Sequence, residues 1–180
     1  MKKIILVILG LLIAISSFAQ IKSATLSASG LTCSMCSKAI YKAIGRVPFV
    51  KSVDADIEGS KYQITFKEGA VIVLDDLKKA VENAGFSVAS LQVTAQFPPV
   101  AIANDTHLEY GGSTYHFLNV AGQTISGDKT FTVVDKKFLP DADYRRYAKM
   151  TTMKCIETGR TAACCTKGGA IGTRVYHVTL

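Results

Sequence analysis

The sequence lacks most of the features that are typical of an enzyme or a nucleic-acid-binding protein. It has no Ser-His-Asp grouping, no glycine-rich phosphate loop and no spaced carboxylate pair. The formal net charge is +7, but acids and bases are interspersed along the chain. It has no block of roughly five or six like charges, so a basic patch for nucleic acid is not indicated. We therefore expect neither catalysis nor nucleic-acid binding.

The N-terminus is typical of an export signal. Two lysines precede an unbroken apolar run over residues 4–15, and the sequence SFA then fits the small-x-small rule for signal peptidase. A membrane anchor is the alternative, but the run is shorter than the roughly 20 residues that span a bilayer. No cysteine follows it directly, so a lipid anchor has no attachment site. We expect residues 1–19 to be removed, leaving an exported or periplasmic protein without a stable membrane anchor.

The number of cysteines is odd, at five. Cysteines of exported proteins normally form disulfides. With an odd number, at least one thiol must stay reduced, pair between molecules or bind another group.

The hydrophobic pattern up to residue 93 predicts a ferredoxin-like βαββαβ unit. Ala24, Leu26 and Ala28 share one face of a strand, and apolar residues then recur at helical spacing. A hairpin, a second helix that stops at Gly85 and a last strand complete the order. The expected elements are a strand over 23–29, a helix over 36–47, strands over 53–57 and 62–66, a helix over 74–84 and a strand over 86–93.

A change in the residue pattern near residue 97 predicts a second domain. Pro98-Pro99 interrupts the preceding pattern, and the segments STYHFLNV, KTFTVVDKKF and GTRVYHVTL then alternate β-branched and aromatic residues with polar ones. DADYRRYAKM is typical of one short helix. We expect an α+β protein with a ferredoxin-like domain over 20–97 and a small β-rich domain over 98–180.

The segment GLTCSMCSKAI, residues 30–40, carries the strongest chemical signal. It places Cys33 in the loop after the first strand and Cys36 in the first turn of the helix. Unpaired N–H groups and the helix dipole favour anions there, so two thiolates could hold a cation. A disulfide and thiol exchange are the alternatives. Thioredoxin-like exchange is disfavoured because Thr32 stands where an aromatic residue would be expected and because the element order differs.

This segment resembles the Gly-Met-Thr-Cys-x-x-Cys signature of heavy-metal-associated domains, which occur in copper chaperones, mercury-binding periplasmic proteins and metal-transporting ATPases. LKKAVENAGF is similar to the second helix and following loop of that family. The resemblance covers residues 21–93. It implies that Cys33 and Cys36 are the metal thiolates. Gly30 and Thr32 would shape the loop, and Phe86 would be the apolar neighbour of the site.

The chain departs from the family pattern at two positions. Leu31 replaces the usual Met, whose side chain normally packs beneath the loop, so Leu should serve. Leu74 occupies a position where a capping Ser or Thr is usual, so we expect the second helix to start at Asp75. Met35, between the cysteines, is expected to face solvent.

The resemblance implies that a soft metal ion is bound between two sulfurs. Cu(I) is the first candidate, and another heavy metal such as Hg(II) is the alternative. Ligand softness agrees, because a thiolate pair selects such ions, whereas structural Zn(II) takes four ligands. The expected role is capture or delivery of the ion, with a metal-transporting membrane protein or another metal-binding domain as partner. The alternative is a periplasmic thiol/disulfide or structural module whose cysteines form disulfides.

The second domain contains another sulfur-rich segment, MTTMKCIETGRTAACCTKGG. One interpretation is a second copper site; the favoured one is a hairpin turning at ETGR, with Cys155 bridged to Cys164 or Cys165. His107 and His116 are expected to be isolated residues rather than ligands. The copper-site interpretation uses Met150, Met153, Cys155, Cys164, Cys165 and His177.

Overall fold

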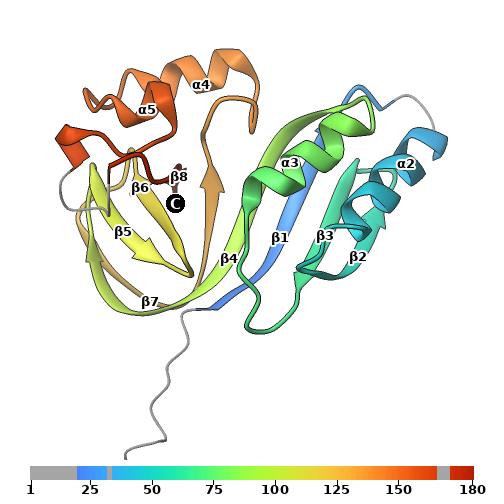
Figure 1. The fold of residues 1–180 in the computed structure, drawn as a ribbon, viewed down its shortest axis with the longest axis horizontal. Helices are drawn as coiled ribbons and strands as arrows, with labels where there is room; N and C mark the ends of the chain where they lie inside the picture. The colour runs from blue at the N-terminus through green and yellow to red at the C-terminus, as the bar shows by residue number, and fades with distance from the viewer. Residues whose placement is uncertain (1–19, 32–33, 166–170) are drawn as a thin grey trace, which may run out of the picture.

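A computed structural model of the chain describes residues 20–31, 34–165 and 171–180. The strands are β1 (Gln20–Ser29), β2 (Val50–Asp56), β3 (Lys61–Phe66), β4 (Ser87–Ile102), β5 (Thr106–Tyr110), β6 (Ser113–Phe117), β7 (Gln123–Val133) and β8 (Val175–Thr179). The helices are α2 (Ser34–Gly45), α3 (Leu74–Asn83), α4 (Asp141–Ala148), α5 (Cys155–Thr158) and a 3-10 turn at Ala163–Cys165. All eight strands form one sheet in the order β2-β3-β1-β4-β7-β8-β6-β5 (Figure 1).

The first half of the chain has the predicted ferredoxin-like fold. Its elements follow the order β1-α2-β2-β3-α3-β4, and the strands pair antiparallel as β2-β3-β1-β4. Helices α2 and α3 cover this end of the sheet, whereas α4 and α5 lie over the other end (Figure 1). The α+β fold class, with a β-rich C-terminal part, is confirmed.

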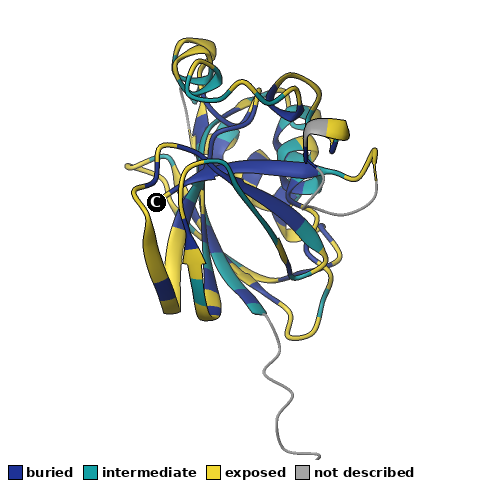
Figure 2. Cartoon of the chain, turned by 90° about the vertical axis from the view of Figure 1, so that its left-hand side faces the viewer, coloured by how far each residue is buried: buried dark blue, intermediate teal, exposed yellow. Residues whose placement is uncertain are grey.

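The predicted apolar faces form the core. Ala24, Leu26 and Ala28 are all buried on β1, because alternate side chains of a strand point to the same face. Ile40 and Ile44 of α2, four residues apart, are fully buried against the sheet. Figure 2 shows long buried stretches in the strands that face the helices.

The last strand of the ferredoxin-like unit is longer than expected. It was predicted to end at Val93, but β4 runs on through Pro98-Pro99 to Ile102 and pairs with β7. The ladder shifts register between Phe97 and Val100, and β1 does not pair beyond Gln96. Prolines are tolerated at such a bulge, where no ladder N–H is needed. Both halves therefore share one sheet. That the chain divides into two domains near residue 97 stays a prediction.

The predicted start of the second helix and the predicted hairpin at ETGR were both wrong. Helix α3 begins at Leu74 rather than Asp75, because the Asp76 N–H bonds the Val73 carbonyl at 3.0 Å. The ETGR segment forms the end of α5 instead of a hairpin. Gly159 adopts φ +66° and its N–H closes a helical turn on the Cys155 carbonyl at 2.7 Å.

No helix among the described residues is long and apolar enough to cross a membrane. The expected export signal, residues 1–19, lies outside the described residues.

A partly buried ion pair ties α3 to Arg174, the residue directly before β8 in the other half. Arg174 Nε donates to Asp75 Oδ2 at 2.7 Å, and the same guanidinium contacts Asp135 at 2.9 Å. Burial by itself would raise the pKa of Asp75, but hydrogen bonding and the positive charges of Arg174 and Lys78 lower it to about 2. The carboxylate is thus stabilised mainly by a residue from the opposite end of the sequence.

This ion pair predicts a defined pH dependence of stability. Because the folded pKa of Asp75 lies below the ordinary value of about 3.9, its contribution is present above that pH and is lost as the pH falls toward 2. We expect the free energy of unfolding of the wild type to fall by roughly 2 kcal/mol more between pH 5 and 2 than that of Asp75→Asn, measured by urea denaturation. Asp76→Asn, a neighbouring surface acid, should follow the wild type. Parallel curves for Asp75→Asn and the wild type would contradict the assignment.

Candidate functional site

The loop between β1 and α2 places one predicted ligand at a helix start. β1 ends at Ser29, and α2 begins at Ser34, so Cys36 is the third residue of the helix and is half-buried. The N–H groups of a first helical turn have no partner within the helix, which makes this end favourable for anionic groups. Cys33 and Thr32 lie outside the described residues.

The strand-to-helix connection depends on Gly30. Its φ of +86° lies in the left-handed region, which favours glycine. A Cβ at this position would lie 4.0 Å from Cδ1 of Phe86. Leu31 packs against the hydrophobic core, as the sequence comparison with the family signature predicts.

The end of α3 brings Phe86 to this loop. Gly85, at φ +88°, donates its N–H to the Glu82 carbonyl at 2.9 Å, and the Phe86 N–H reaches the Val81 carbonyl at 3.2 Å. These two bonds form a Schellman motif, which fixes the direction in which the chain leaves the helix. The Phe86 ring lies beside Gly30, and its place next to the metal site stays a prediction.

A buried hydrogen bond holds the first turn of α2 against the sheet. Ser37, directly after Cys36, has its hydroxyl 2.9 Å from the hydroxyl of Tyr62 on β3. The Tyr62 hydroxyl also lies 3.3 Å from the Ser37 carbonyl, and both residues are buried. Met35 is 73% exposed, so the side chain between the cysteines faces solvent as predicted.

In the sulfur-rich segment of the second half, Cys155 lies 3.4 Å from His177, two residues that the copper-site interpretation of the sequence grouped together. Cys155 is fully buried and contacts all three histidines of the chain. The prediction that His107 and His116 are isolated is wrong, because their rings stack with centroids 4.1 Å apart. The signal was present in the sequence: in a hairpin with the two-residue turn Gly111-Gly112, these positions face each other.

The other residues of that segment contribute less. Cys165 is buried, and Met150 and Met153 are half-buried. The side chain of Cys164 lies outside the described residues, and the bridge from Cys155 to Cys164 or Cys165 stays a prediction.

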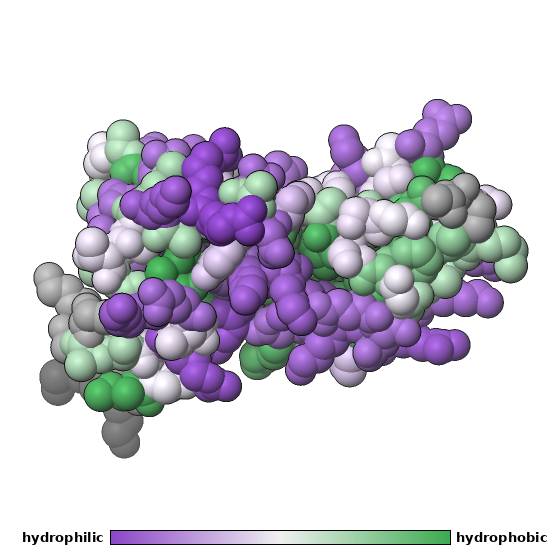
Figure 3. Space-filling model, turned by 90° about the horizontal axis from the view of Figure 1, so that it is seen from above, coloured by the Kyte–Doolittle hydropathy of each residue, from purple (hydrophilic) through white to green (hydrophobic). Residues whose placement is uncertain are grey.

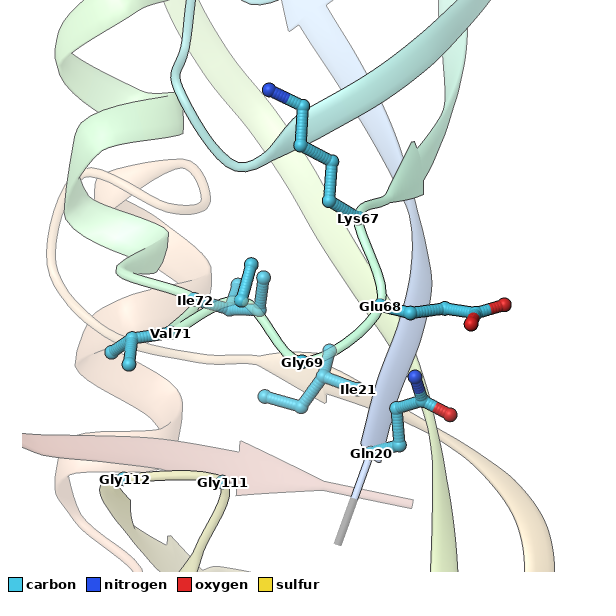
Figure 4. Close-up of a pocket in the computed structure, with 10 residues that line it drawn as sticks. Gln20, Ile21, Lys67, Glu68, Gly69, Val71, Ile72, Gly111 and Gly112 are labelled. Carbon is cyan, nitrogen blue, oxygen red and sulfur yellow. The ribbon is translucent and has the colours of Figure 1, made fainter. Parts of the chain in front are cut away.

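A pocket of about 580 Å³ lies away from both groups of cysteines. It is formed by the start of β1, the β3–α3 loop and the β5–β6 turn. Ile21, Val71 and Ile72 lie around it, and Glu68 points away from them (Figure 4). Its lining contains no sulfur or imidazole, so it is not a candidate for soft-metal binding.

Comparison with known proteins identifies the family of the first half. Residues 25–87 match the family model of the heavy-metal-associated domain. The chain is 38% identical over 69 residues to a mercuric transport protein periplasmic component of Pseudomonas fluorescens, covering 38% of this chain and 75% of that protein. The chain belongs to the heavy-metal-associated domain family. It is also 32% identical over 65 residues to copper chaperone CopZ of Bacillus subtilis, covering 36% and 93% of the two chains.

A solved structure is similar to the same part of the chain. The crystal structure of oxidised MerP from Ralstonia metallidurans is 33% identical, with a TM-score of 0.36, and covers 39% of this chain and 96% of that one. The family match itself covers residues 25–87 and ends within the first half of the chain.

The Ser37–Tyr62 contact gives a test of how this heavy-metal-associated domain holds its candidate ligand helix. Tyr62→Phe removes one hydroxyl and leaves a buried partner at Ser37, so we expect the free energy of unfolding to fall by about 1–3 kcal/mol in urea denaturation. Tyr41→Phe changes an exposed tyrosine of α2 and should stay within about 0.5 kcal/mol of the wild type. Equal stabilities of the two variants would show that the buried contact does not hold the helix.

Proposed function

We propose that this protein is an exported carrier of a soft metal ion, which it holds between Cys33 and Cys36 and passes to a partner. Cu(I) is the first candidate for this ion. The observation that carries the proposal is the position of Cys36 in the first turn of α2, within a heavy-metal-associated domain. Its relatives include metal chaperones and transport components, which agrees with a protein that catalyses no reaction.

The donor set favours a soft ion. Cys33 precedes α2 directly and Cys36 follows one turn later, so both sulfurs belong to one short segment at the positive end of the helix. Within the described part of the chain, the one group of three or more His, Cys, Asp or Glu side chains placed to hold a metal lies in the other half. A thiolate pair without further ligands selects Cu(I) or Hg(II) over harder ions.

The position of the site suits transfer rather than storage. Cys36 is half-buried, and the neighbouring Met35 is largely exposed. A second thiolate protein can therefore approach the ion and exchange ligands with it. A deeply buried site would instead require the domain to open before the ion could leave.

The surface around the site indicates the chemistry of the partner. Helix α2 contains no acidic residue and exposes Lys38, Lys42 and, just after its end, Arg46. Figure 3 shows green and white side chains at the end of the molecule that carries α2, with purple ones at its margins. Such a surface fits weak docking to an acidic partner. The copper-transporting ATPase of Helicobacter pylori, which is 34% identical over 58 residues, represents the class of partner we propose.

Export is proposed on two grounds. The N-terminal 19 residues have the composition of a signal peptide. One relative is itself a periplasmic component.

A competition titration tests the proposed ligands. We expect the reduced full chain to bind one equivalent of Cu(I) against a competing chelator, and the double variant Cys33→Ser/Cys36→Ser to lose this binding, since both sulfurs are needed. Met35→Ala is the matched control, because it changes the intervening exposed residue and should leave the affinity within about threefold, as expected of a surface substitution.

Two results would contradict the proposal. Cu(I) binding that survives the double substitution would show that the ion is held elsewhere. A chain isolated without reductant that carries a Cys33–Cys36 disulfide and no metal would favour the thiol/disulfide alternative.

A further inference from the structure

The second half of the protein collects every histidine of the chain in one row. His107 on β5 is the register partner of His116 on β6, and His116 is the register partner of His177 on β8. Register partners on adjacent strands point to the same face of a sheet, so the three imidazoles stand side by side. The ring centroids of His116 and His177 are 5.0 Å apart. The chain has three histidines in all, and none lies elsewhere.

One sulfur faces this row. Cys155, the first residue of α5, places its Sγ 3.8 Å from His107 Nε2, 3.5 Å from His116 Nδ1 and 3.4 Å from His177 Nε2. Cys155, His116 and His177 are all fully buried, and His107 is half-buried. The approach to the sulfur is therefore from the side of His107.

Carboxylates orient two of the imidazoles. Asp135 Oδ1 lies 2.5 Å from His177 Nδ1, and Asp105 Oδ1 lies 3.0 Å from His116 Nε2. Each carboxylate accepts the N–H of its imidazole, so the opposite nitrogen directs its lone pair at the sulfur. Carboxylates hold metal-binding histidines in this way, fixing the tautomer and raising the basicity of the ligand nitrogen.

The atoms around the sulfur form a set of metal-ligand types. Three imidazole nitrogens face Cys155, and a thiol carries one hydrogen, which it can donate to one of them. A positive ion between the sulfur and the nitrogens would be attracted by all four atoms.

The sulfur–nitrogen distances match a tetrahedral metal site. With metal–sulfur and metal–nitrogen bonds of about 2.3 and 2.0 Å at a tetrahedral angle, the sulfur and nitrogen ligands lie about 3.5 Å apart. The observed separations of 3.4 to 3.8 Å bracket that value. The ligand atoms of His107, His116 and Cys155 all lie within 4.8 Å of one another.

We propose that Cys155, His107, His116 and His177 form a second metal site, which takes a borderline divalent ion, Zn(II) or Cu(II). One thiolate with three imidazoles is a harder donor set than the thiolate pair proposed at α2, so the two sites select different metals. This site depends on residues outside the heavy-metal-associated domain and is independent of the proposed Cu(I) function.

A nucleophilic Cys-His-Asp triad is the main competing interpretation, since Cys155, His177 and Asp135 are in contact in that order. A nucleophilic thiol must be accessible to its substrate. Cys155 is 0% exposed, and two further imidazoles crowd the sulfur. The burial and the extra nitrogens both favour an ion over a substrate.

A titration in the Cys33→Ser/Cys36→Ser background tests the site. In the reduced full chain of this background we expect one equivalent of Co(II) to give a sulfur-to-cobalt charge-transfer band with tetrahedral d–d absorption, and Zn(II) to displace it. Cys155→Ser should abolish the charge-transfer band. Cys165→Ser is the matched control, as a second buried cysteine of the same segment, and should retain it.

A second variant guards against loss of fold. Asp105→Asn keeps the shape of a partly exposed residue whose φ of +61° asparagine also accepts. It weakens the orientation of His116, so we expect the affinity for Zn(II) to fall by about tenfold, the lower end for such partners. The metal-free circular dichroism spectrum should not change.

Three results would overturn the site. The first is no Co(II) or Zn(II) binding by a folded chain. The second is a charge-transfer band that survives Cys155→Ser. The third is mass spectrometry of the unreduced exported chain that shows Cys155 bridged to Cys164 or Cys165, or rapid alkylation of Cys155 in the metal-free folded state. Because the background lacks the loop cysteines, each of these results leaves the Cu(I) titration of the wild-type chain unaffected, and the converse also holds.

Discussion

The backbone pairing of β4 is the constraint on which the rest of the structure depends. β4 pairs with β1 along one edge and with β7 along the other, so a single strand belongs to both halves. Past Gln96, the register partner of Gln20, the bulge at Pro98-Pro99 lets β4 continue its pairing with β7. The Asp75–Arg174 ion pair adds a side-chain link between α3 and the residue directly before β8. The heavy-metal-associated domain is therefore built into a larger sheet.

The two candidate metal centres arise from different structural devices. At the first, a glycine with positive φ leads the chain toward a helix N-terminus, where Cys36 is half-buried in the first turn. At the second, strand register aligns three imidazoles and α5 supplies one buried thiol. The thiolate pair proposed at the helix start suits an ion that is passed on, whereas a buried, four-ligand site suits an ion that stays.

Much of the first half could be predicted from the sequence. The alternation of Ala24, Leu26 and Ala28 and the spacing of Ile40 and Ile44 report local periodicity, and both sets are buried as expected. The path of β4 could not be predicted in this way. Pro98-Pro99 is typical of a boundary, and only pairing with the distant strand β7 shows that the strand continues.

Two histidines of the second site were missed for a related reason, although Cys155 and His177 had been named for such a site. The His107–His116 pair follows from the Gly111-Gly112 turn, which is a local signal. His177 joins them through a parallel pair between β6 and β8, which are far apart in the sequence. Cys155 reaches the row because Gly159 ends a helix at ETGR, where a hairpin was expected. Non-local pairing is set by the whole sheet and leaves little trace in any one segment.

X-ray absorption spectroscopy of the chain, isolated from its native compartment without reductant, tests the central claim most directly. The account predicts two sulfur ligands at the copper edge. At the zinc edge, or for a second copper ion, it predicts one sulfur at about 2.3 Å with three nitrogens at about 2.0 Å. Sulfur-only coordination of every bound ion, or a metal-free chain with its cysteines oxidised, would contradict the account.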